Sequence, residues 1–195
     1  MPTLTKGDGP NDLRGVTTLG MGLSWDATGG ASGGLLGRAK RKRGVDLDAF
    51  GILLDNDGQP VRYVGLDVTD AMDDGSVTST GDNQTGKGDG DDEFIKMELN
   101  RIPDHISAVL ITIAAFKKGS SFDKAAKVSC KVYDGTGGTM DVVADIWPSL
   151  LGTGNAIAVA KAVRAGTSWT LEVVNTRGKV EQGNIQALLR FAVNH

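Results

Sequence analysis

The residues best suited to chemistry lie in one glycine-rich acidic segment, Gly81–Glu93. Its sequence, Gly-Asp-Asn-Gln-Thr-Gly-Lys-Gly-Asp-Gly-Asp-Asp-Glu, holds five carboxylates, one Asn, one Gln, one Thr and four glycines. Calcium takes about 6–8 oxygen ligands, which carboxylates, Asn side chains and backbone carbonyls all supply. Glycines let a loop fold tightly enough to aim several oxygens at one point. The segment therefore predicts a calcium site.

The kinds of ligand in this segment separate calcium from other ions. No Cys or His stands near the segment, so the all-oxygen set disfavours zinc and copper. Magnesium usually keeps several waters and takes only one or two carboxylates. The acidic ligands also exceed what one ion can use, so we expect two calcium ions per chain.

Two known loop motifs do not fit the segment. An EF-hand read from Asp82 fails because Gln84 and Gly86 stand where acidic or Asn ligands are needed. The P-loop pattern holds as far as Lys87, but Gly88 follows where a Ser or Thr should hold magnesium. One alternative stays open from composition alone, namely a solvated acidic loop kept disordered by self-repulsion.

Two predicted strands bring further carboxylates toward such a loop. Thr17–Trp25 has apolar residues at every second position and ends at Asp26. Val45–Leu54 begins with the alternating acids Asp46 and Asp48 and then becomes fully apolar. These strand ends favour an ordered site over a disordered loop.

The remaining pattern predicts a mainly β fold, a sandwich of two sheets closed by a short C-terminal helix. Apolar residues at helical spacing place that helix in Gln182–Val193. Gly65–Glu93 shows almost no periodicity and reads as a long acidic loop. Ala156–Arg164 is compatible with either a strand or a helix. The other predicted strands are Gln59–Val64, Phe94–Leu99, Ala108–Ala115, Lys127–Tyr133, Thr139–Asp145 and Ser168–Asn175.

The chain of 195 residues has the size of a single domain, which we place at 1–195, with a glycine-rich basic insertion at about 27–44. Within the insertion, Arg38–Arg43 places five basic residues in six positions, which suits an anionic partner such as nucleic acid or lipid head groups. A solvated loop is the alternative. The net charge of −3 otherwise gives no reason to expect a nucleic-acid binder. Neither a signal peptide nor a membrane span is visible, so we expect a cytoplasmic protein.

Four stretches of the sequence resemble the TerD family. The acidic segment is similar to the family signature, and Leu23-Ser-Trp-Asp26, Val45-Asp-Leu-Asp-Ala49 and Asp74-Gly-Ser-Val77 support the match. The similar order extends from about Leu19 to Ala114. The chain departs from the family in its basic insertion, in Ala114-Ala-Phe116 where a His-Glu-like pair is usual, and in a C-terminal third that matches only loosely.

The resemblance implies a β-sandwich that binds two calcium ions and has no enzymatic activity. It also implies a role in tellurite resistance and in wider stress or phage defence. Protein partners in a stress-response complex follow from that role, at the inner face of the membrane, and no small-molecule substrate is identified. The alternative is a metal-dependent hydrolase of phosphodiesterase type that uses the same carboxylates. The family positions carried over as metal ligands are Asp26, Asp46, Asp48, Asp82, Asn83, Asp89, Asp91, Asp92 and Glu93.

Overall fold

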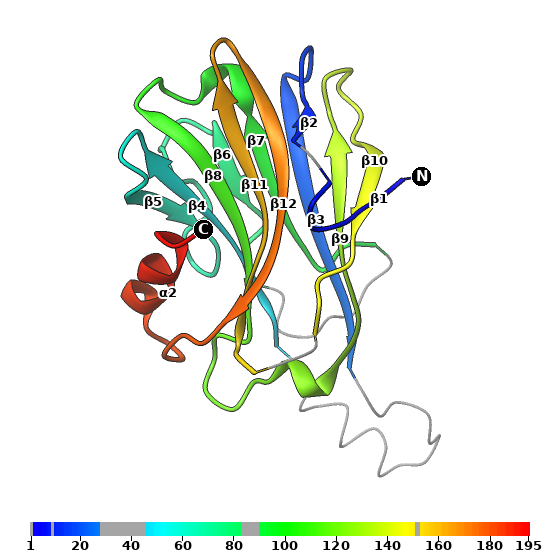
Figure 1. Cartoon of the computed structure of the whole chain (residues 1–195), viewed down its shortest axis with the longest axis vertical. Helices are drawn as coiled ribbons and strands as arrows, with labels where there is room; N and C mark the ends of the chain where they lie inside the picture. The colour runs from blue at the N-terminus through cyan, green and yellow to red at the C-terminus, as the bar shows by residue number, and fades with distance from the viewer. Residues whose placement is uncertain (1, 9, 28–45, 83–89, 151–152) are drawn as a thin grey trace.

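Alternating apolar residues assemble the chain into two six-stranded sheets that pack face to face (Figure 1). The computed structural model describes residues 2–8, 10–27, 46–82, 90–150 and 153–195. In the first sheet the strand order is β1 (Thr3–Leu4), β10 (Asp141–Ile146), β9 (Ala125–Asp134), β3 (Thr18–Ala27), β7 (Glu93–Glu98) and β6 (Val77–Ser79). In the second it is β2 (Asn11–Asp12), β12 (Ser168–Gly178), β11 (Ala156–Ala165), β8 (Ile106–Ala114), β4 (Asp48–Asp55) and β5 (Pro60–Val64). The predicted β-sandwich is confirmed.

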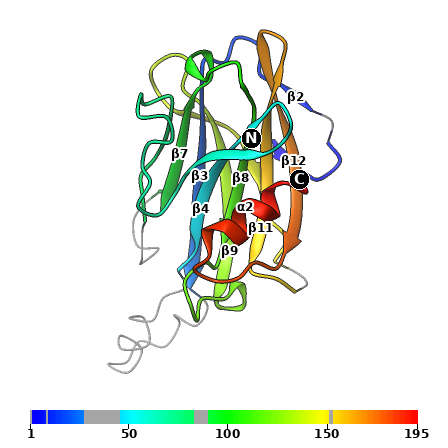
Figure 2. The same ribbon diagram turned by 90° about the vertical axis from the view of Figure 1, so that its left-hand side faces the viewer.

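Strands β4 and β8 of the second sheet are buried on both faces. Leu53 of β4 faces the core between the sheets, whereas Phe50 and Ile52 face the opposite side. There the helix α2 (Ile185–Ala192) covers them with Leu188 and Ala192 (Figure 2). This double burial explains why β4 and β8 read as continuous apolar runs. The predicted C-terminal helix is confirmed, and among the described residues no helix is long and apolar enough to span a bilayer.

Some elements differ from the sequence-based expectation. Ala156–Ala165 is a strand, so the helical alternative is wrong; its small buried side chains fit between the neighbours β8 and β12. The stretch expected to be irregular contains β6, which pairs with β7. Strand β4 begins at Asp48, so Asp46 lies just before it. Two short 3-10 helices, η1 (Leu99–Arg101) and η2 (Phe122–Lys124), lie in connections.

Antiparallel pairing brings the acidic segments to one end of the sandwich. Leu23 pairs with Glu93, so the end of β3 lies beside the start of β7. Asp48 pairs with Ala114, so the start of β4 lies beside the end of β8. This end is the lower one in Figure 1, where β3 ends and β4 begins. Of the predicted insertion at about 27–44, Ala27 ends β3 and residues 28–44 fall outside the described residues.

Candidate metal centre

Three carboxylates meet at this end of the sandwich. Asp48 begins β4, Asp46 lies just before it, and Asp82 follows β6. One ligand atom from each lies within 4.8 Å of the others, which is close enough for a single ion to touch all three. It is the one group of three or more metal-ligating side chains found in the described part of the chain. Members of the predicted ligand set therefore converge from two separate segments.

Asp48 is the most unusual member because it is buried without compensation. Its residue is 0% exposed, and neither carboxylate oxygen has a hydrogen-bond partner among the described residues. Burial first, and then the nearby charges of Asp46 and Asp82, raise its pKa to about 7. The charge of Lys117 and the nearby backbone N–H of Phe116 oppose this rise. A buried carboxylate of this kind is costly unless a cation accompanies it.

Lys117 is the cation closest to this group in the described chain. It follows β8, and its Nζ lies 2.8 Å from Asp46 Oδ2 and 2.8 Å from Asp82 Oδ2. Burial alone would lower its pKa, but hydrogen bonds to Asp46 and Asp82 and their charges outweigh that effect and raise it. Sequence reasoning missed this residue. Its position after the central strand was the available signal, yet only the Asp48–Ala114 register places it beside the acids.

The acids that precede and begin β7 have their own protein partners. Glu93 is 1% exposed, and its Oε2 accepts a 2.6 Å hydrogen bond from the backbone N–H of Ala49. Asp92 Oδ2 accepts a 3.0 Å hydrogen bond from the backbone N–H of Trp25. These contacts fix where β3, β4 and β7 meet. Whether Asp92 and Glu93 also ligate an ion stays a prediction.

Asp91 lies on the face of β3 and β9 among other polar groups. Its Oδ1 accepts from Ser24 Oγ at 2.9 Å and pairs with Lys131 Nζ at 2.8 Å. Its Oδ2 accepts from the Tyr133 hydroxyl at 2.5 Å. Gly22 leaves the room for this carboxylate, since a Cβ there would lie 1.8 Å from Asp91 Oδ2. The structure therefore gives Asp91 three protein partners, and its role as a metal ligand stays a prediction.

The other predicted ligands cannot be placed. Asp26 pairs through its backbone with Ala126 at the end of β3, but its side chain is not described. Asn83 and Asp89 lie outside the described residues, as does the basic run Arg38–Arg43.

The three carboxylates fit a hard divalent cation. All the donor atoms are oxygens, and both oxygens of Asp48 and Oδ1 of Asp46 are buried with no hydrogen-bond partner among the described residues. Orphaned buried acceptors are rare in folded proteins and need an explanation. A bound cation would give these oxygens a partner, and calcium prefers such ligands.

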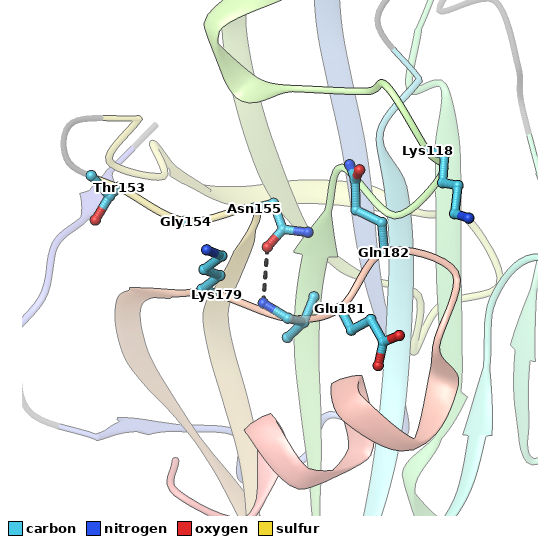
Figure 3. Close-up of a pocket in the computed structure, with 8 residues that line it drawn as sticks. Lys118, Thr153, Gly154, Asn155, Lys179, Glu181 and Gln182 are labelled. Carbon is cyan, nitrogen blue, oxygen red and sulfur yellow. Dashed lines mark hydrogen bonds between the residues drawn. The ribbon is translucent and has the colours of Figure 1, made fainter.

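A pocket of about 710 Å³ lies next to the segment that carries Lys117 (Figure 3). Its lining includes Lys118, Asn155, Lys179 and Gln182, and Asn155 Oδ1 accepts a 2.9 Å hydrogen bond from the Val180 N–H. Gln182 anchors the wall through hydrogen bonds to the carbonyl oxygens of the 115–120 connection. The three aspartates do not line the pocket, so it is separate from the candidate metal centre.

Comparison with known proteins agrees with this architecture. The family model described as "TerD domain" matches residues 3–191. The chain is 36% identical to "Tellurium resistance protein TerZ" of Serratia marcescens over 63% of the chain and 62% of that protein, less than two thirds of its length. It is 28% identical to "Stress response protein SCP2" of Bacillus subtilis (strain 168) over 88% of the chain and 85% of that protein.

A solved structure has the same fold. It is described as a homologue of telluride resistance protein (TerD) from Streptomyces coelicolor A3(2), and it superposes with a TM-score of 0.65. The match covers 88% of this chain and 95% of the solved chain at 19% sequence identity.

Proposed function

The chain belongs to the TerD domain family, and from this premise we propose that it is a calcium-binding protein of tellurium resistance or stress response. In this proposal it acts as a calcium-dependent interaction module and not as an enzyme. The names of the two matched relatives describe resistance and stress response, and neither describes a reaction.

The observation that carries calcium binding is the environment of Asp48. Its carboxylate is fully buried, lacks hydrogen-bond partners among the described residues and lies beside Asp46 and Asp82. Such an arrangement destabilises the folded state unless a cation binds there. Calcium takes about 6–8 oxygen ligands, and in this proposal the three aspartates provide part of that set. The other ligands are those predicted from the family pattern, namely Asp26, Asn83, Asp89, Asp91, Asp92 and Glu93.

Calorimetric titration of calcium into the chelator-treated protein tests this proposal. We expect two ions per chain, because the acidic ligands exceed the needs of one. A ligand that binds only the folded state adds about 2.7 kcal/mol to its stability at one hundred times the dissociation constant. Melting should therefore shift upward with calcium and downward with chelator. Absence of binding heat together with an unchanged melting temperature would contradict the proposal.

The interaction partners are proposed from the sequence. Arg38–Arg43 would contact an anionic surface, and a protein complex beside the membrane would use the calcium-loaded face. Sedimentation with vesicles that contain an anionic phospholipid tests the first part. Replacement of the five basic residues by Ser should abolish vesicle binding and leave calcium affinity nearly intact. Equal sedimentation of both proteins would contradict it.

A further inference from the structure

Lys117 occupies the space between two of the proposed calcium ligands. Its Nζ touches Asp46 Oδ2 and Asp82 Oδ2, each at 2.8 Å. We propose that Lys117 is a built-in competitor for calcium, an internal cation that holds the acidic centre together without metal and leaves it when calcium binds. This inference rests on the proposed calcium binding and adds how the centre is regulated.

The lysine ammonium and a calcium ion would compete for the same carboxylate oxygens. Calcium binds carboxylate oxygens at about 2.3–2.6 Å. Nζ lies 2.8 Å from each Oδ2 atom, so a calcium ion bound to the same atoms would lie at most about 5.4 Å from the ammonium. At that distance a dication and an ammonium repel each other strongly in a partly buried site. The two cations therefore exchange and do not share the oxygens.

The lysine is an incomplete substitute for the ion. Its hydrogen bonds go to Asp46 and Asp82, and neither oxygen of Asp48 has a hydrogen-bond partner in the described chain. An ammonium has only three donors, whereas calcium accepts about 6–8 oxygens and can include both of those of Asp48. Calcium therefore binds the centre more favourably than the ammonium does, because it can also contact the oxygens of Asp48. This difference in binding free energy drives the exchange.

The lysine can leave without rearrangement of the backbone. Its side chain is 36% exposed, so the ammonium already borders solvent. The connection around it is held by hydrogen bonds from the Ala115 N–H to the Asn155 oxygen and from the Gly183 N–H to the Phe116 oxygen. Rotation about the side-chain bonds is therefore enough to free the carboxylates.

Chemical labelling of the natural protein tests the exchange directly. Brief reductive methylation, read by peptide mass spectrometry, reports how accessible each lysine ammonium is. Lys118 is the internal control because it is the next residue in the chain and is exposed. We expect calcium to increase the labelling of Lys117 several-fold and to leave that of Lys118 unchanged. Unchanged or reduced labelling of Lys117 in a protein that binds calcium would overturn the inference.

Paired substitutions give a second test by calcium calorimetry. Lys117→Met and Lys118→Met remove the same charge one residue apart, but only the first removes the competitor. Two charge-assisted hydrogen bonds correspond to roughly a tenfold effect or more, so Lys117→Met should bind calcium at least about tenfold more tightly than the natural protein. Lys118→Met should change affinity only slightly. Equal changes in both variants would overturn the inference and leave calcium binding standing. No binding by all three proteins would instead overturn the proposed function.

Discussion

Glu93 Oε2, on the first sheet, accepts a 2.6 Å hydrogen bond from the backbone N–H of Ala49, on the second sheet. The carboxylate is buried, and it joins the start of β7 to the start of β4. Because Ala49 follows Asp48, this contact also sets the position of the candidate metal centre. A residue predicted as a metal ligand thus has a structural contact of its own.

Replacement of Glu93 should therefore reduce stability even in calcium-free protein. Glu93→Ala leaves the Ala49 N–H buried without an acceptor, which costs about 1–3 kcal/mol in addition to the lost packing. Glu93→Gln keeps an oxygen that can accept this bond, so it should lose less. Urea unfolding in the presence of chelator measures both. Equal losses in the two variants would show that the Ala49 contact contributes nothing.

Gly22 and Asp91 should depend on each other. A Cβ at Gly22 would lie 1.8 Å from Asp91 Oδ2 and 3.0 Å from the Tyr133 ring. Gly22→Ala must displace the carboxylate from its partners, and we expect a loss of roughly 1–3 kcal/mol in the free energy of unfolding. In an Asp91→Ala background the 1.8 Å clash with the carboxylate is absent, so most of this loss should disappear. A double-mutant cycle measures the coupling, and additive losses would contradict the predicted interaction.

Most of the fold could be predicted from the pattern of apolar residues in the strands. Thr17–Trp25 alternates because one face packs in the core, and it became β3 with nearly those bounds. The Gln182–Val193 helix was visible because its apolar spacing matches the side that covers the second sheet. The strand β6 was not visible, since Val77–Ser79 is too short to show a period.

The candidate centre was only partly visible because it depends on strand register. Asp46 and Asp48 could be predicted from their place at a strand start. The approach of Lys117 could not, since it follows from the pairing of Asp48 with Ala114, residues that are distant in sequence. The environment of Asp91 likewise depends on Lys131 and Tyr133 of the neighbouring strand. Local sequence gives residue types, and long-range pairing decides which of them meet.

Asp48 should make the calcium-free protein less stable as pH rises from about 4 to 7. Burial and the charges of Asp46 and Asp82 raise its pKa to about 7 from an ordinary value of 3.8. In this interval the folded state holds a proton that the unfolded state has lost, so stability falls with pH. The full effect, reached above pH 7, is at most about 4 kcal/mol.

The Asp48→Asn substitution isolates this contribution from that of other acids. The amide does not titrate, so the variant should lack the decline and exceed the natural protein in stability at pH 8 without calcium. Its calcium affinity should fall. Urea unfolding of chelator-treated proteins at several pH values measures the difference, and parallel pH profiles for the two proteins would contradict it.

Asp82→Asn should weaken calcium binding far more than Asp57→Asn, although both remove one negative charge. Asp82 belongs to the carboxylate group, whereas Asp57 lies in the exposed turn between β4 and β5, at the opposite end of β4 from Asp48. Exposed charges are screened beyond about 8 Å at physiological ionic strength, so Asp57→Asn should change the dissociation constant by less than about twofold. For Asp82→Asn we expect a loss of about tenfold or more, since a ligand charge is removed.

The size of that loss should also depend on Lys117. Asp82→Asn removes a negatively charged oxygen that would bind either calcium or the lysine ammonium. Part of the lost calcium affinity is therefore offset, because Lys117 competes less strongly for the centre. In a Lys117→Met background no such offset exists, and the same substitution should cost more affinity. Calorimetric dissociation constants for the two single variants and the double variant measure this difference. Equal losses from Asp82→Asn and Asp57→Asn would mean instead that calcium is attracted by diffuse negative charge, with no coordinated centre at Asp46, Asp48 and Asp82.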